Sequence, residues 1–181
     1  MDRARRVSIS KRLSLALRHE PASLGLVLDA AGWARVDDVI AGFGAHGEAV
    51  SRDDLVEVVA TSDKQRFALS ENGERVRANQ GHSLDVDLGL MPREPPPILF
   101  HGTSRDVLEA IRREGLDKRS RAHVHLSADV RTAEIVARRR AGEHVILRVC
   151  AGAMHAGGHA FYLSDNGVWL TERVPPEYLE D

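Results

Sequence analysis

Apolar residues in the first third of the chain recur at the three- and four-residue spacing that is typical of helices. This pattern predicts helical segments at residues 10–19, 37–43 and 51–62. Ser51 is the expected N-cap of the last segment, and Pro21 disfavours helical geometry at the residue before it. Arg18 and His19 therefore stand in the last turn of the first predicted helix.

The period changes at residue 67, where apolar and polar residues begin to alternate. Residues 67–78 place an Asn72-Gly73 pair between two alternating runs, which is a strong signal for a β-hairpin. On its second strand Arg75 and Arg77 share one face. Helices followed by such a hairpin predict a small winged-helix lobe.

A proline-rich segment follows this lobe. Four prolines lie between residues 92 and 97, a composition that fits neither a helix nor a central strand. We interpret residues 89–97 as a linker between a first domain, residues 1–88, and a second domain, residues 98–181.

The second domain combines short strands with helices. The pattern predicts strands at 98–100, 123–127 and 144–151, helices at 105–114 and 129–140, and a hairpin over 160–174. Ser104 is the expected cap of the first of these helices, and Gly115 its end. The fold class is therefore α/β, of the α+β kind, in two lobes.

Composition narrows the possible functions. The chain has 181 residues, 43% of them hydrophobic, which is enough for a buried core. It lacks an apolar run of membrane-spanning or signal-peptide type, so we expect a cytoplasmic protein. A net charge of −2 argues against coating nucleic acid by bulk positive charge, so any polyanion site must be local. The single cysteine, Cys150, is interpreted as a buried small side chain.

Two glycine-containing motifs are candidates for phosphate binding. Residues 42–47 match GxGxxG but lack a preceding strand and a following helix, so we interpret them as a loop. The HGT motif at 101–103 follows a predicted strand and precedes the helix after Ser104. Its backbone N–H groups and Thr103 hydroxyl would then face an anion or a ribose, although an ordinary turn has the same pattern.

Histidines at 123 and 125 lie on one face of a predicted strand. With His101 they have the chemistry of a zinc site, but neither a cysteine nor an HExxH helix supplies a further ligand of the right type. Hydrogen bonding to a polar ligand is the interpretation that we prefer, and we expect no metal.

Arginine makes up most of the positive charge, since three of the 25 basic residues are lysines. This excess has two alternative explanations, codon bias and a role of arginine in bidentate phosphate binding. The composition alone does not distinguish between them. Arg18, Arg77 and Arg121 come from three predicted elements, and together they would match a phosphate dianion. For Arg18 and His19 the alternative is a favourable interaction with the helix C-terminus.

Read together, several segments resemble the RNA 2′-phosphotransferase family of the tRNA splicing type, including its bacterial homologues. The matching segments span residues 10–33, 75–83, 86–103, 121–127 and 161–179. The resemblance implies a winged-helix lobe, an NAD-dependent ADP-ribosyltransferase-like lobe that is rich in β-structure, and an active site in the cleft between them.

The resemblance also implies a two-step reaction. An internal RNA 2′-phosphate attacks the nicotinamide ribose of NAD⁺ and expels nicotinamide, which gives an RNA-2′-phospho-ADP-ribose intermediate. Transesterification then yields RNA with a free 2′-OH and ADP-ribose 1″,2″-cyclic phosphate.

Residue roles follow from the matched motifs. The implied catalytic set is Arg18, His19, Arg77 and Arg121. The implied NAD-binding residues are His101, Gly102, Thr103, His125 and Ser127. The implied RNA or phosphate neighbours are Asn79, Gln80 and His82. The chain departs from the family at Arg140-Ala141, where relatives commonly carry Arg-His, so an adenosine contact there is in doubt.

Two alternatives remain. The first is ADP-ribose transfer to a terminal phosphate of a nucleic acid, which the same arginines would serve. The second is a non-catalytic winged-helix module that binds RNA, against which the 4% aromatic content and the net charge both argue. The expected partner is an RNA with an internal 2′-phosphate, such as a tRNA, and a monomer is expected although the sequence leaves the oligomeric state open.

Overall fold

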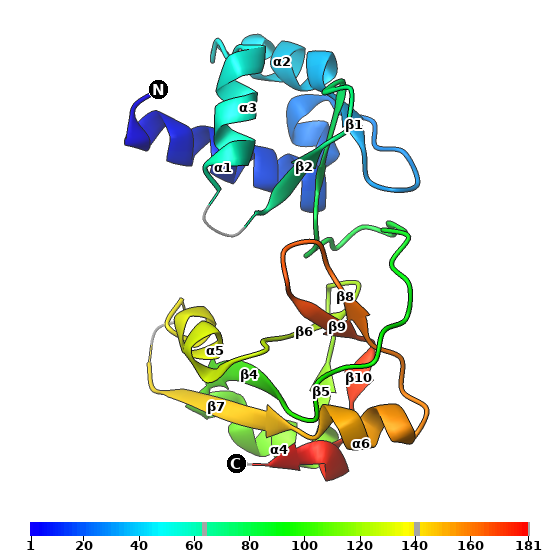
Figure 1. Cartoon of the computed structure of the whole chain (residues 1–181). Helices are drawn as coiled ribbons and strands as arrows, with labels where there is room; N and C mark the ends of the chain where they lie inside the picture. Colours follow the sequence, from blue (N-terminus) through cyan, green and yellow to red (C-terminus); the bar gives the residue numbers. More distant parts are fainter. Residues whose placement is uncertain (63–64, 140–141, 181) are drawn as a thin grey trace. The chain divides into compact units, whose positions relative to one another are not determined.

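Helices and small antiparallel sheets make up the chain in the computed structural model, which describes residues 1–62, 65–139 and 142–180 (Figure 1). The chain divides into two units, Met1–Gly89 and Leu90–Asp181. Each unit has its own hydrophobic core and is described by itself. No helix within the described ranges is long and apolar enough to cross a membrane.

The first unit surrounds a small sheet with helices. Its elements are α1 (Arg3–Arg18), the 3₁₀ turn η1 (Pro21–Leu24), β1 (Ala34–Arg35), α2 (Val36–Ala45), α3 (Arg52–Ala60), β2 (Phe67–Leu69) and β3 (Arg75–Ala78). The strands are antiparallel in the order β1-β3-β2. Their buried side chains pack on the apolar faces of α1, α2 and α3.

Helix α1 begins earlier than the predicted residue 10. Asp2 caps it by accepting a hydrogen bond from the Arg5 backbone N–H at 2.8 Å, so the polar residues before residue 10 are also helical. The prediction at the other end is confirmed, because Arg18 is the last helical residue and His19 the C-cap. Ser51 caps α3 as predicted and forms a capping box with Asp54.

The hairpin prediction is confirmed. Strands β2 and β3 pair antiparallel, and Ser70 and Arg75 close the loop through a backbone hydrogen bond of 2.9 Å. Gly73 has φ +68°, a conformation that glycine adopts without strain. The loop interpretation of residues 42–47 is wrong, because residues 42–45 form the end of α2, where Gly42 lies directly against the Leu24 carbonyl.

The second unit contains several small sheets with helices packed around them. Its elements are β4 (Leu99–Ser104), η2 (Arg105–Val107), α4 (Leu108–Glu114), β5 (Leu116–Asp117), β6 (Val124–Leu126), α5 (Val130–Ala137), β7 (His144–Val149), α6 (Ala151–Ala156), β8 (Tyr162–Leu163), β9 (Trp169–Thr171), β10 (Arg173–Val174), η3 (Pro176–Tyr178) and β11 (Leu179–Glu180). The sheet orders are β11-β7-β4, β6-β9-β8 and β10-β5.

The turn predicted at residues 101–103 is wrong. Strand β4 continues through Ser104, because every residue from Leu99 to Ser104 pairs with a residue of the antiparallel strand β7. Ser104 therefore ends a strand, and its side chain makes no capping hydrogen bond. The predicted helix begins with the turn η2 and ends at Gly115 as expected. Helix α5 was expected to reach residue 140, but Ala137 is its last residue.

Other differences are smaller. Strand β7 is half-exposed rather than buried, since Arg148 faces solvent between Leu147 and Val149. Cys150 is only partly buried, and its thiol donates to Glu180 Oε1 at 3.3 Å. The hairpin of β8 and β9 is confirmed.

The proline-rich segment forms neither helix nor strand, as predicted. Its backbone is nevertheless fastened within the second unit. The Arg93 N–H donates to the Phe161 carbonyl at 2.7 Å, and the Pro97 carbonyl accepts from the Gly152 N–H at 3.0 Å.

Candidate functional site

Arg18 and His19 end α1 next to the segment that follows β3. The Ser83 N–H donates to the Arg18 carbonyl at 2.9 Å, and His19 Nδ1 lies 2.9 Å from Ser83 Oγ. The Ser83 hydroxyl also lies 3.4 Å from the Arg18 carbonyl, to which it donates. It then accepts from His19 Nδ1, so the imidazole is oriented by a side chain distant in sequence.

Arg77 lies on β3, on the face opposite the buried Val76. Its guanidinium carbon is 4.7 Å from the centre of the Trp33 ring, and that of Arg75 is 5.6 Å from the same ring. The prediction that both arginines share a face is confirmed. Sequence reasoning missed Trp33, which positions both guanidinium groups by a cation–π interaction.

His82 belongs to the segment that follows β3 and is 2% exposed. Burial first, and then the positive charges of Arg18, His19 and Arg77, lower the pKa of His82 to about 4. His82 is therefore neutral at physiological pH. Arg18, His19 and Arg77 therefore all lie within electrostatic range of one buried imidazole.

Asn79 is also buried, at 5% exposed, and its Nδ2 donates to the Gln65 carbonyl at 2.6 Å. Within the described ranges Asn79 Oδ1 and His82 Nε2 have no hydrogen-bond partner. Gly81 has φ +87° and lies against the Arg18 guanidinium, where a Cβ would be 3.6 Å from Nη1. Gln80 is half-buried in the same segment.

The first unit thus brings together six of the predicted residues. They are Arg18, His19, Arg77, Asn79, Gln80 and His82. We call this group the cationic cluster. Its positive charges add to the effect of burial in lowering the pKa of His82, and positive charges of this kind attract a phosphate dianion.

A pocket of about 560 Å³ occupies the second unit, and four further predicted residues line it: His101, Thr103, Arg121 and His125. His101 Nδ1 donates to the His125 carbonyl at 3.0 Å, which fixes its tautomer. Arg121 Nη1 donates to His125 Nδ1 at 3.1 Å, which places the His125 proton on Nε2. The pocket therefore presents oriented imidazoles, a guanidinium and a buried hydroxyl.

Gly102 and Ser127 are not among the residues that line this pocket. Gly102 faces α5 and lies directly against the Ala133 carbonyl, so its lack of a side chain allows α5 to pack on β4. Ser127 exchanges backbone hydrogen bonds with Phe100, at 2.8 and 2.9 Å.

The loop before β6 adds charges that sequence reasoning missed. Lys118 and Arg119 line the same pocket as Arg121, together with Arg173 from β10. Arg119 has φ +54°, an uncommon conformation for a residue other than glycine. Three cations within residues 118–121 were a visible signal in the sequence.

A metal site receives no support. Within the described residues no group of three or more histidine, cysteine or acidic side chains is placed to hold an ion. The His123 ring instead packs edge-on against Tyr162, with 5.6 Å between ring centres. Burial and then Lys118 lower its pKa, while Glu172 opposes them. The departure at Arg140-Ala141 lies outside the described residues.

Together, these features define a mixed α/β protein with a cationic cluster on one unit and a pocket of cationic and polar groups on the other. Guanidinium groups and polar N–H or O–H donors are the chemical groups that bind phosphate in proteins. Residues 4–173 match the RNA 2′-phosphotransferase, Tpt1 / KptA family, and the chain belongs to that family.

Curated relatives agree with this assignment. The chain is 53% identical over 171 residues to a probable RNA 2′-phosphotransferase of Rhizobium johnstonii, covering 94% of this chain and 91% of the relative. It is 52% identical over 179 residues to one of Trichormus variabilis, covering 99% and 98%. One from Streptomyces griseus is 50% identical over 186 residues, covering 99% and 98%.

Proposed function

We propose that this protein is an NAD-dependent RNA 2′-phosphotransferase that removes an internal 2′-phosphate from RNA. One observation supports this most strongly: Arg18, His19 and Arg77 gather around the buried, neutral His82 in a chain of this family. A tetrahedral phosphate dianion matches that arrangement in charge and in the paired N–H donors that arginine offers.

The proposed domain organisation is a winged-helix lobe at 1–88, a linker at 89–97 and an ADP-ribosyltransferase-like lobe at 98–181. The division of the chain after Gly89 supports the boundary. Helices α1 to α3 followed by the β2-β3 hairpin, with β1 on the other side of β3, support the winged-helix description.

NAD fits the chemistry of the second unit's pocket, since oriented imidazole N–H groups, the Thr103 hydroxyl and the cations there suit ribose hydroxyls and a pyrophosphate. His101, Thr103 and His125 line the pocket and would hold it, whereas Gly102 and Ser127 stay predicted NAD neighbours that do not line it. NAD supplies an anomeric carbon whose leaving group is nicotinamide.

The arginines of this chain would orient the phosphate and stabilise its charge. Arg18 and Arg77 would hold its oxygens so that one of them is in line for attack, and Arg121 would add a third guanidinium. Arginine remains charged at any physiological pH, so these contacts do not depend on a metal or on a proton transfer.

His19 would either donate a proton to the departing 2′-oxygen or make a further phosphate contact. The contact between Nδ1 and Ser83 Oγ orients the ring for either role. His82 is buried and neutral, whereas His19 is exposed, and we propose that His82 shapes the cluster rather than transferring a proton.

The test is incubation of the purified protein with a short RNA that carries one internal 2′-phosphate, with and without NAD⁺, followed by mass analysis. We expect RNA with a free 2′-OH, nicotinamide and ADP-ribose cyclic phosphate, all dependent on NAD⁺. Stable ADP-ribosylated RNA without cyclic phosphate would instead favour transfer to a phosphate. Binding without nicotinamide release would favour a non-catalytic module.

A further inference from the structure

We propose that a basic groove along α1 binds the RNA backbone phosphates that flank the 2′-phosphate. This proposal rests on the proposed function, because it takes the RNA substrate from it. The groove is distinct from the cationic cluster, but it leads to Arg18 along the same helix. The ligand used to test the groove is a single-stranded RNA.

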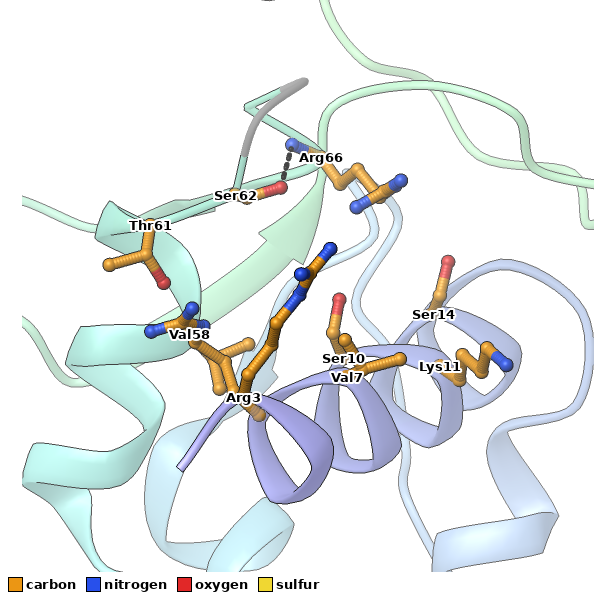
Figure 2. Close-up of a pocket in the computed structure, with 10 residues that line it drawn as sticks. Arg3, Val7, Ser10, Lys11, Ser14, Val58, Thr61, Ser62 and Arg66 are labelled. Atoms are coloured by element: carbon orange, nitrogen blue, oxygen red, sulfur yellow. Dashed lines mark hydrogen bonds between the residues drawn. The ribbon is translucent and has the colours of Figure 1, made fainter. Parts of the chain in front are cut away.

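The groove is a pocket of about 450 Å³ in the first unit (Figure 2). Its lining includes Arg3, Arg6, Ser10, Lys11 and Ser14 from α1 and Arg66 from the segment before β2. Figure 2 shows the side chains of Arg3 and Arg66 extending toward each other, from α1 and from the segment before β2. The hydroxyls of Ser10 and Ser14 point into the space beside them.

The α1 side of the groove is one continuous helix face. Besides Arg6, the lining residues of α1 follow each other at intervals of one, three or four residues: Arg3, Val7, Ser10, Lys11 and Ser14. Arg18 continues this row beyond the groove. Residues at this spacing stack on one side of a helix. The buried face of α1, with Ile9, Leu13 and Leu17, packs in the core instead. A polar, basic stripe therefore runs roughly 22 Å from Arg3 to Arg18, at the helical rise per residue.

Charge distinguishes this face from the rest of the helix. Arg5 and Arg12, which do not line the groove, form ion pairs with Asp54 and Glu48, and Arg6, which does line it, forms one with Glu57. Within the described ranges, by contrast, no carboxylate pairs with Arg3, Lys11 or Arg66, and no described residue lining the groove is acidic. Such charges are available to a polyanion, whereas a structural ion pair would have to be broken first.

Arg66 joins the groove to the cationic cluster. Its carbonyl accepts from Arg18 Nη2 at 3.5 Å and from the Asn79 N–H at 2.9 Å, while its side chain lines the groove. A strand whose 2′-phosphate lies at Arg18 would therefore pass Arg66 and Lys11 next. Hydroxyls and cations of this kind contact phosphate and sugar without reading sequence, so the groove would favour longer RNA of any sequence.

Binding of a fluorescent six-nucleotide RNA without a 2′-phosphate tests the groove directly. The single variants are Lys11→Gln and Arg66→Gln, and the triple variant combines both with Arg3→Gln. The matched control is Arg5→Gln, on the opposite face of α1. Each single loss should weaken binding on the order of tenfold. It should also reduce the slope of log affinity against log salt by about 0.7. We expect wild-type affinity and slope for Arg5→Gln.

Turnover gives the second readout. With a 2′-phosphorylated dinucleotide the triple variant should keep the wild-type kcat/KM, whereas with a 2′-phosphorylated hexanucleotide its KM should rise. Equal affinity of wild type and triple variant for the hexanucleotide would overturn the groove. If the wild type binds RNA through these residues but removes no phosphate with NAD⁺, the groove stands and the proposed function fails.

Discussion

The buried imidazole of His82 should make the first unit sensitive to acid. His82 is neutral in the folded protein because burial and three neighbouring cations hold its pKa at about 4, against 6.5 when it is exposed. The unfolded chain therefore binds more protons than the folded chain between these pKa values, and folding stability must fall as the pH falls through this window. Above pH 6.5 the effect is absent.

The magnitude follows from the two pKa values. At pH 5 the difference corresponds to about 2 kcal/mol of lost stability, and below pH 4 to about 3 kcal/mol. The perturbation is His82→Gln, which removes the titrating group and keeps a polar side chain of similar length. Relative to this variant, the wild type should lose about 2 kcal/mol between pH 7.5 and pH 5.

The assay is urea unfolding at both pH values, followed by the fluorescence of Trp33 in a Trp169→Phe background. Trp33 reports on the first unit, because it belongs to that unit and stacks on Arg77. An NMR titration of the His82 ring gives the pKa directly. A stability difference between wild type and variant that does not change with pH, or a ring pKa above 6, would refute the reasoning.

Three further predictions concern packing, thiol chemistry and metals. Gly102→Ala should destabilise the protein by about 1–3 kcal/mol in a thermal melt, because Ala133 occupies the space of its Cβ. Gly44→Ala, which has open space, should be neutral or stabilising; equal melting points for the two variants would contradict this packing argument. Burial and then Glu180 raise the pKa of Cys150, so iodoacetamide should alkylate it more slowly than free cysteine, and Glu180→Gln should speed the reaction. Turnover should survive EDTA; strong inhibition reversed by zinc would revive the metal alternative.

Local signals were enough to predict much of the fold. Asn72-Gly73 identified the hairpin, Ser51 the start of α3 and Gly115 the end of α4, because each depends on residues near it in the sequence. Strand β5 was not predicted, and β10 was assigned to the hairpin over 160–174, since the pairing of these two strands joins residues distant in sequence. Strand β4 includes the HGT motif because it pairs with β7, and this pairing with a distant segment cannot be inferred from local propensity.

The candidate site divides in the same way. The shared face of Arg75 and Arg77 follows from strand alternation and was predicted. The stacking of Arg77 on Trp33 and the orientation of His19 by Ser83 are contacts between segments far apart in the chain. The periodicity of the sequence therefore does not predict them. The matched segments of the family resemblance brought these residues together without explaining how they interact.

The central claim is that the cationic cluster holds the 2′-phosphate during an NAD-dependent reaction. Its most direct test is the rate at which wild type, Arg77→Ala and Arg75→Ala remove an internal 2′-phosphate from a short RNA in the presence of NAD⁺. Both arginines lie on one face over Trp33, so they are matched in position. The account predicts a loss on the order of a hundredfold or more for Arg77→Ala and near wild-type turnover for Arg75→Ala. A folded Arg77→Ala protein with wild-type turnover would contradict it.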